Sequence, residues 1–126
     1  RSPTVTGVQT CALPILVNAH ATATKAGDLA EYAALRAVFG RHLPPLCANK
    51  SLFGHAMGAG SAVETVFALH GMLKARVPPT INYRPDPEME LDCVAQGARA
   101  ISQEFVMKNA FGFGGCNACA IFRQCR

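Results

Sequence analysis

Residues 49–64 read NKSLFGHAMGAGSAVE, and the rest of the chain is organised around this stretch. A lysine, a histidine and a run of very small residues lead into an apolar segment, where Glu64 is the only formally charged side chain between Ser51 and Leu73. A helix that is apolar on almost every side is a buried helix, so we predict a buried central helix over roughly residues 55–75. Glycine weakens a helix relative to alanine, so the small residues at 58–62 indicate close approach by another backbone or by a ligand.

His55 lies at or just before the start of this predicted helix. The positive end of the helix dipole disfavours an imidazolium there, so we expect a neutral ring. A neutral imidazole can donate one hydrogen bond to a developing oxyanion without giving up a proton. A lone histidine among apolar residues can equally be a hydrogen-bonded core residue. The segment is not predicted to span a membrane, because Glu64, His55 and His70 lie within it.

Composition limits the possible classes of protein. The chain has 126 residues, half of them hydrophobic, with sparse charges, which indicates one modest domain with a buried sheet. A net charge of +4 is mild and suits an acidic protein partner as well as nucleic acid. Nucleic-acid binding is not predicted, because no basic cluster with interleaved aromatic residues is visible.

The predicted elements alternate in the manner of an α/β protein. Asp28 is a good N-cap for a predicted helix over residues 29–39, and Glu31 completes a capping-box pattern with it. Gly40 ends this helix. The predicted order is strand, helix, strand, helix and then paired strands, over residues 16–17, 29–39, 46–48, 55–75, 105–109 and 119–122.

Residues 1–15 read unlike the rest of the chain. The run VTGVQTCALPI at residues 5–15 looks like the in-frame translation of a sequencing-adapter oligonucleotide. We interpret residues 1–15 as a non-native segment and exclude them from functional reasoning; a natural polar N-terminal arm is the alternative. On the adapter interpretation, residues 16–126 are the tail of a larger protein whose upstream sequence has been lost.

Three polar motifs stand where the sites of α/β proteins collect, at the end of a strand or the start of a helix. They are NAHATAT at residues 18–24, KSLFGH at 50–55 and NAFGFGG at 109–115. In this order and spacing they resemble the C-terminal half of a β-ketoacyl-acyl carrier protein synthase, a thiolase-like condensing enzyme. The resemblance covers residues 16–122 and implies an α/β fold in which a mixed β-sheet is packed between helices, with a buried central helix.

The resemblance implies a decarboxylative Claisen condensation. A malonyl unit on acyl carrier protein loses carbon dioxide, and the enolate attacks an acyl thioester held on a cysteine. By the match, His20 and His55 donate hydrogen bonds to the malonyl thioester oxygen, each worth ~3–4 kcal/mol when well placed. Lys50 resembles the lysine behind the second histidine, and Glu64 the carboxylate that pairs with it; a buried cation without a partner would be expensive.

Other site residues follow from the same match. Thr22 and Thr24 resemble the hydroxyls that bond the pantetheine amides. Phe113 resembles the gating phenylalanine between the acyl pocket and the pantetheine tunnel, and its N–H resembles one half of the oxyanion hole for the acyl thioester. Phe111 is assigned to the substrate-binding wall. For Phe111 and Phe113, plain core packing is the alternative.

The chain departs from the family pattern at several positions. Ala21 and Ala23 replace the usual glycine and serine, Phe53 replaces a threonine and could narrow the site, and Cys116 replaces another threonine. The nucleophilic cysteine belongs to the family's N-terminal half, whose motif is not in this sequence. We therefore expect the chain on its own to be inactive.

The remaining cysteines receive structural interpretations. Cys47 and Cys93 are predicted to be small buried residues. Cys116 and Cys119 form a C-x-x-C pattern, but in an extended segment residues three apart point to opposite faces. We predict no metal site, and no disulfides in a family of intracellular enzymes.

The resemblance also implies partners. They are acyl carrier protein, malonyl and acyl thioesters carried on its 4′-phosphopantetheine, and a second copy of the enzyme in a homodimer. No further cofactor is expected. The expected location is cytoplasmic, with mitochondria and plastids left open.

Several alternatives to a fatty-acid synthase stay open. Asn18 before His20 favours the fatty-acid type over polyketide ketosynthases, in which glutamate is usual. A polyketide ketosynthase, a non-catalytic chain-length-determining subunit and an inactive gene fragment remain. Retention of His20, Lys50 and His55 counts against the non-catalytic subunit.

Overall fold

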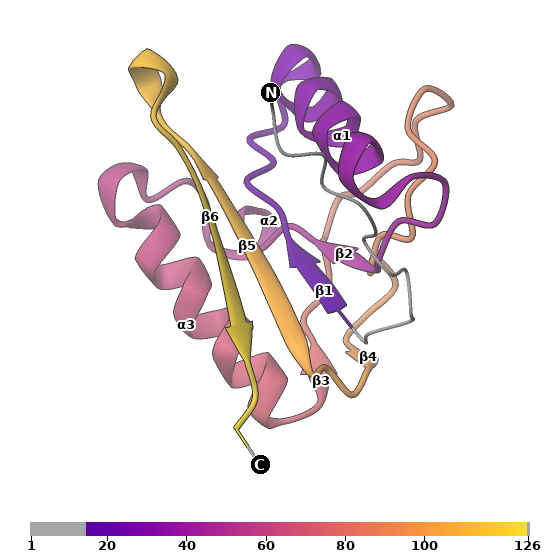
Figure 1. Cartoon of the computed structure of the whole chain (residues 1–126), viewed down its shortest axis with the longest axis vertical. Coiled ribbons are helices and arrows are strands. Elements are labelled where there is room, and N and C mark those ends of the chain that lie inside the picture. The colour runs from indigo at the N-terminus through magenta and orange to yellow at the C-terminus, as the bar shows by residue number, and fades with distance from the viewer. Residues whose placement is uncertain (1–14, 126) are drawn as a thin grey trace, which may run out of the picture.

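A computed structural model describes residues 15–125 of the chain (Figure 1). Short 3₁₀ turns at Met57–Ala59 and Phe113–Gly115 accompany the regular elements. These are β1 (Ile15–Asn18), α1 (Lys25–Phe39), β2 (Leu46–Cys47), α2 (Lys50–Phe53), α3 (Gly60–Leu73), β3 (Arg76–Val77), β4 (Arg99–Ala100), β5 (Phe105–Phe111) and β6 (Asn117–Arg123).

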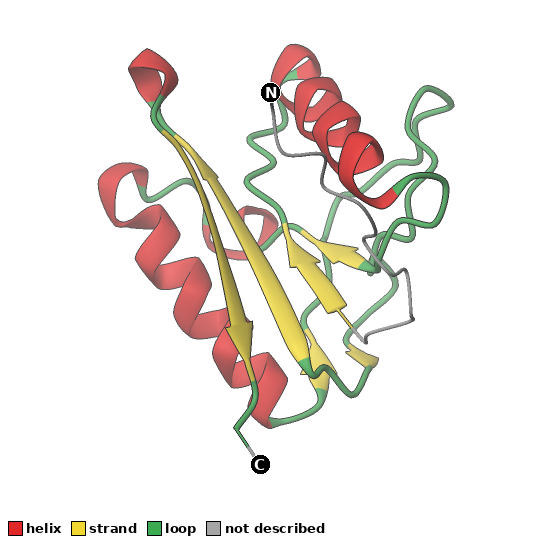
Figure 2. Cartoon of the chain, viewed as in Figure 1, coloured by secondary structure: helices red, strands yellow, loops and turns green. Residues whose placement is uncertain are grey.

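The main sheet is mixed and has the strand order β2-β1-β5-β6 (Figure 2). Strand β1 runs parallel to both β2 and β5, whereas β6 returns antiparallel to β5. A separate two-stranded sheet pairs β3 with β4. The three parallel strands therefore end at one edge of the sheet, where the polar motifs follow them.

Helices α1 and α3 cover opposite faces of this sheet. Adjacent strand residues point to opposite faces, and the two core clusters divide accordingly. Leu16 and Val106 pack with Ala68 and Met72 of α3. Their neighbours on the other face pack with Leu35 of α1; they are Val17, Leu46 and Met107. The predicted α/β class, a mixed sheet packed between helices, is confirmed.

Helix α3 is shorter than predicted and is buried along one face only. Met57 has φ +45°, so the chain between His55 and the helix is not α-helical. The buried face of the helix consists of Gly60, Glu64, Ala68, Gly71 and Met72. The other face exposes apolar side chains, so the predicted central helix is buried on its sheet-facing side and exposed on the other in the described chain.

The small residues of this region differ in what they approach. A Cβ on Gly71 would lie 2.7 Å from the carbonyl oxygen of Arg76, so a side chain there would collide with the following strand. A Cβ on Gly60 would lie 3.6 Å from the His55 ring, whereas Gly58 faces open space. Of these three glycines, only Gly71 is approached too closely for a side chain, because the contact at Gly60 is an ordinary van der Waals distance.

The start of α1 corrects another prediction. The helix begins at Lys25 with Thr24 as its N-cap, so Asp28 lies inside the helix. Glu31 does not form a capping box but is buried, facing the sheet. The predicted end is confirmed, because Gly40 has φ +68° and its N–H bonds the carbonyl of Arg36.

Several strands differ in length or number from the prediction. Strands β5 and β6 extend beyond the predicted ranges, and the two-residue strands β3 and β4 were not predicted. Ile15, assigned to the non-native segment, lies in β1 and pairs with Phe105, whereas residues 1–14 lie outside the described residues. None of the helices within 15–125 combines the length and the apolar character needed to cross a membrane.

The exposed apolar side chains predict how the 126-residue chain behaves alone. Val66 and Leu73 of α3 are 67% and 71% exposed, and Ile121 of β6 is 63% exposed. Exposed apolar surface of this kind favours association, so we expect oligomers in size-exclusion chromatography with light scattering. The paired substitutions Val66→Ser and Leu73→Ser should reduce the apparent mass, whereas Val38→Ser on α1, 58% exposed in the native chain, should not. A monodisperse monomer with a cooperative thermal transition would contradict this expectation.

Candidate active site

The three predicted motifs meet at the edge where the parallel strands end. His20 follows β1, Lys50 begins α2 directly after β2, and Phe111 ends β5. The ring centroids of His20 and His55 are 5.9 Å apart at an interplanar angle of 87°. The ring of Phe111 lies 5.3 Å from that of His20. The structure thus brings both predicted histidines and Phe111 into one site.

Lys50, Glu64 and Lys108 form a buried ion cluster that contacts this site through Lys50. Lys50 Nζ lies 2.6 Å from Glu64 Oε1, which agrees with the predicted pair. The second oxygen of Glu64 pairs with Lys108 of β5. The side chains of Lys50, Glu64 and Lys108 are 8%, 0% and 3% exposed. Lys108 was not predicted, although a charge inside an otherwise apolar strand signals a buried partner.

Lys50 contacts the first histidine rather than the second. Its ammonium donates to the His20 carbonyl oxygen at 2.5 Å and lies 3.4 Å from His20 Nδ1. The expectation that Lys50 lies behind His55 is therefore wrong. The reason is that α2 follows β2 directly, which places Lys50 beside the end of the neighbouring strand β1.

Hydrogen bonds assign the proton position on both rings. The backbone N–H of Met57 donates to His55 Nδ1 at 3.1 Å, so that nitrogen carries no proton and Nε2 is the N–H. The Lys50 ammonium has only protons to offer, so His20 Nδ1 is also an acceptor. Both neutral rings consequently have Nε2 as their donor.

The electrostatic surroundings of His20 favour its neutral form. Burial and then the Lys50 charge lower the pKa of His20, and Lys108 acts in the same direction. Glu31 and Glu64 oppose them by raising it, with the net shift downward. An imidazole of lowered pKa stays uncharged at neutral pH. The ring can then donate a hydrogen bond without acting as an acid.

Glu31 fixes the backbone of the first motif. Its two oxygens accept the N–H groups of His20 and Ala21, each at 2.9 Å. The side-chain amide of Asn109 on β5 donates to the same carboxylate at 2.9 Å. The capping-box interpretation missed this role. Its local pattern hides the fact that Glu31 and Leu35, one helical turn apart, share the buried face of α1.

The loop after His20 contains alanines in left-handed conformations. Ala21 has φ +33° and Ala23 has φ +60°. A residue with a Cβ pays roughly 1–2 kcal/mol there relative to its usual conformations. The two substitutions noted in the sequence are therefore accommodated at a cost.

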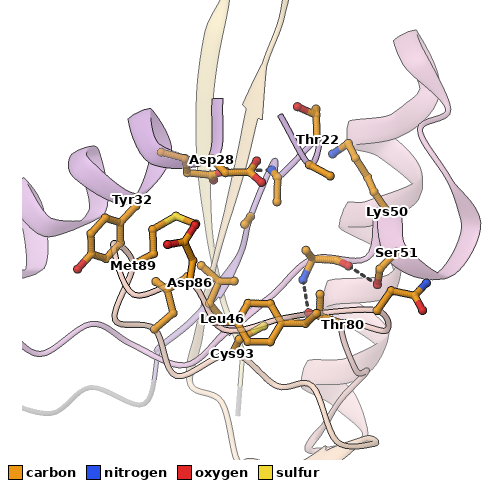
Figure 3. Close-up of a pocket in the computed structure, with 18 of the residues that line it drawn as sticks. Thr22, Asp28, Tyr32, Leu46, Lys50, Ser51, Thr80, Asp86, Met89 and Cys93 are labelled. Atoms are coloured by element: carbon orange, nitrogen blue, oxygen red, sulfur yellow. Dashed lines mark hydrogen bonds between the residues drawn. The ribbon is translucent and has the colours of Figure 1, made fainter. Parts of the chain in front are cut away.

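A pocket of about 670 Å³ opens beside the ion cluster (Figure 3). Thr22 and Lys50 lie at one end, and Tyr32 and Met89 lie at the other. His55 also lines this pocket. Thr24 is exposed, and its hydroxyl oxygen lies 3.3 Å from the hydroxyl oxygen of Thr22. The pocket thus extends from Lys50 and His55 to Tyr32 and Met89, and His20 is not among its lining residues.

The aromatic residues divide between the site and its surroundings. Phe113 is 91% exposed, so core packing does not explain it in the described chain. Gly114 and Gly115 follow it with φ +74° and +80°. Phe53 does not narrow the site, because its ring packs on Phe67 of α3 with centroids 5.0 Å apart.

Two of the described cysteines lie near the site, Cys47 at the end of β2 and Cys93 in the lining of the pocket. Burial raises the pKa of Cys47 to about 12, which makes its thiol a poor nucleophile. Cys93 was expected to be buried but is half-buried and lines the pocket. Cys116 and Cys119 are exposed. In the described part of the chain, no group of three or more His, Cys, Asp or Glu side chains is placed to hold a metal ion.

Comparison with known proteins gives a consistent family. The family described as "Beta-ketoacyl synthase, C-terminal domain" matches residues 15–84. The 3-oxoacyl-[acyl-carrier-protein] synthase 2 of Mycobacterium tuberculosis (strain ATCC 25618 / H37Rv) is 42% identical over 84% of this chain. Nodulation protein E of Rhizobium sp. (strain N33) is 40% identical over 86% of it. The chain spans about a quarter of the length of these curated relatives, 26% and 28% respectively.

Solved structures show the same fold. The ishigamide ketosynthase/chain length factor matches with a TM-score of 0.85 and 38% identity, over 88% of this chain and 28% of that one. A β-ketoacyl synthase from Burkholderia phymatum STM815 matches with a TM-score of 0.84 and 40% identity, over 90% of this chain and 28% of that one. The fold therefore corresponds to a C-terminal portion of these ketosynthases.

The bonds of Glu31 predict a specific loss of stability. In Glu31→Gln, an amide NH₂ replaces one oxygen and meets a backbone N–H instead of accepting from it. We expect the free energy of unfolding of the full-length protein to fall by ~1–3 kcal/mol, measured by urea denaturation. Glu104→Gln is the matched control, because Glu104 forms an ion pair with the exposed Arg123, and such pairs contribute ~0–1 kcal/mol. Equal losses in the two variants would show that Glu31 does not hold the motif.

Proposed function

Because the chain belongs to the β-ketoacyl synthase family, as its C-terminal domain, we propose that it supplies the decarboxylation half of a 3-oxoacyl-[acyl-carrier-protein] synthase. The reaction is the condensation of malonyl-acyl carrier protein with an acyl thioester in fatty acid biosynthesis. The observation that carries the proposal is the pair of histidine rings at 5.9 Å, both with Nε2 as donor. Similarity to 3-oxoacyl-[acyl-carrier-protein] synthase 2 supports it.

The histidines act on the malonyl thioester. Its carbonyl oxygen accepts hydrogen bonds from Nε2 of His20 and of His55. When the carbon–carboxylate bond breaks and carbon dioxide leaves, its electron pair forms an enolate, and negative charge gathers on that oxygen. Donors already in place stabilise the charge as it develops. Because both rings are neutral, they donate without transferring a proton.

The ion cluster keeps the donors in position. Lys50 holds the His20 carbonyl and faces Nδ1, so the opposite ring nitrogen points away from the lysine. The Met57 N–H donates to Nδ1 of His55, so Nε2 of that ring points away from Met57. Glu64 balances the buried lysine charge. These residues position the histidines and do not touch the substrate.

The other predicted residues receive roles along the substrate path. We assign Thr22 and Thr24 to the pantetheine amides and Phe111 to the wall beside His20.

After decarboxylation, the enolate carbon attacks the acyl thioester, the new carbon–carbon bond forms, and the cysteine thiolate leaves. That cysteine is supplied by the part of a ketosynthase beyond this domain, and the backbone N–H of Phe113 forms one half of its oxyanion hole.

Acyl carrier protein and a second copy of the enzyme are the proposed partners. One matched structure, at 31% identity, is a type II polyketide acyl-carrier protein in complex with its ketosynthase. That complex supports the carrier protein as the source of substrate. The homodimer rests on the family resemblance.

A polyketide ketosynthase is the second candidate. Similarity to the ketosynthase of a type II polyketide synthase, at 31% identity, favours it; another match, at 38% identity, is a ketosynthase/chain length factor. A non-catalytic subunit of that kind is disfavoured because His20, His55 and Lys50 are all present and assembled. Comparing saturated acyl chains with β-keto acyl chains as primers separates the two pathways.

Loss of either histidine should affect one half-reaction selectively. In the full-length protein, His20→Ala or His55→Ala should slow carbon dioxide release from malonyl-acyl carrier protein by ~10²–10³-fold. Acyl transfer to the cysteine should change much less, because the enolate charge develops only during decarboxylation. His70→Ala, an exposed position on α3, is the control. If both half-reactions fell together, the histidines would serve a more general role.

Phe113 should control the order of substrates. Flanking glycines leave its backbone free to move, so Phe113→Ala should raise decarboxylation without a loaded acyl chain relative to condensation. Truncating a packed phenylalanine lowers the free energy of unfolding by ~3–5 kcal/mol. Phe113 is exposed, so the melting temperature of Phe113→Ala should change little. Phe122→Ala, at a residue that packs against the core, should lower the melting temperature without uncoupling. A lower melting temperature with intact coupling in Phe113→Ala would remove that residue from the mechanism.

A further inference from the structure

Lys108 is a buried cation that the proposed mechanism does not use. It lies in the middle of β5 with its side chain 3% exposed. Along β5, Val106 points to the face covered by α3, and Lys108, two residues later, points to the same face. There it meets Glu64 of α3.

Glu64 is held from two sides by this arrangement. Oε1 pairs with Lys50 of α2, and Oε2 pairs with Lys108. Lys108 also donates to the carbonyl oxygen of Asn109, which fixes its ammonium against the β5 backbone. A carboxylate with both oxygens engaged has lost its rotation about the terminal bond. The Lys50 ammonium is consequently fixed relative to β5 and to His20.

We propose that Lys108 is a positioning residue, which holds one oxygen of Glu64 against β5 so that the other directs Lys50 at His20. Its effect on catalysis rests on the proposed function of the domain, whereas its effect on His20 does not. Lys108 touches no substrate.

The charges facing His20 give this role a measurable consequence. They come from each element around the ring: Lys50 of α2, Glu31 of α1, Glu64 of α3 and Lys108 of β5. Lys50, Glu64 and Lys108 together carry one net positive charge. Without Lys108 that cluster is neutral, so His20 should gain a proton at a higher pH. An imidazolium could protonate the enolate carbon and give an acetyl thioester before condensation.

Titration of His20 tests the inference directly. The full-length protein is labelled with ¹³C at histidine Cε1, the His20 signal is assigned from a His20→Asn variant, and its pH midpoint is measured. Lys108→Met should raise this midpoint, and Lys108→Arg, which keeps the charge, should restore most of the native value. Arg123→Met removes an equal charge from the exposed pair with Glu104 and should leave the midpoint unchanged.

An unchanged midpoint in a folded Lys108→Met variant would overturn the inference. If Lys108→Met does not fold, Glu64→Gln replaces it. Removing the carboxylate charge leaves both lysines unbalanced, so the midpoint should fall below the native value. No fall in Glu64→Gln would equally overturn the inference.

The activity arm separates this inference from the proposed function. In Lys108→Met, the acid limb of the pH profile for decarboxylation should move to higher pH, and acetyl-carrier protein should increase relative to the condensation product. Lys108→Arg should reverse both changes. A native protein without decarboxylase activity would refute the proposed function, while the His20 titration would still decide the role of Lys108. An active Lys108→Met protein with a native pH profile would refute the role of Lys108 alone.

Discussion

The buried carboxylate of Glu64, held between two lysines, is the interaction on which the arrangement of the site depends. Desolvating a carboxylate costs several kcal/mol, and removal of one partner from a buried pair typically costs ~3–5 kcal/mol. Here the group is 0% exposed, and its partners come from α2 and β5 while the carboxylate itself comes from α3. Three elements are therefore joined at the point where the three sequence motifs meet.

A second carboxylate performs the matching task on the other face of the sheet. Neighbouring residues of β5 point in opposite directions: Lys108 reaches Glu64 of α3, and Asn109 reaches Glu31 of α1. Each covering helix thus contributes one acid that contacts one of two adjacent residues of the same strand. His20 lies between the two, held through Lys50 from one side and through its backbone N–H from the other. The sheet and both helices specify the position of this one ring.

The sequence was sufficient for the parts of this arrangement that depend on local pattern. Periodicity and turn residues predicted the order of the main elements, and the family resemblance of the three motifs implied the roles of His20 and His55 and the pairing of Lys50 with Glu64. The contacts of Glu31 with Asn109 and of Lys108 with Glu64 were beyond reach, because the two residues of each pair lie 78 and 44 positions apart along the chain. For Glu31, the local capping pattern even pointed to a different role. The exposure of one face of α3 could not be predicted either, since an apolar sequence does not show which of its side chains another element will cover.

The left-handed alanines after His20 bear on how the site comes into being. Taken alone, the segment from Ala21 to Ala23 disfavours the backbone angles it adopts, and the compensating bonds come from Glu31 on another element. The conformation of the loop in the folded chain therefore depends on the hydrogen bonds that Glu31 of α1 accepts. The position of His20 beside His55 therefore depends on contacts between elements and not on the loop alone. A chain with its helices formed but not packed on the sheet would contain His20 and His55 without holding their rings 5.9 Å apart.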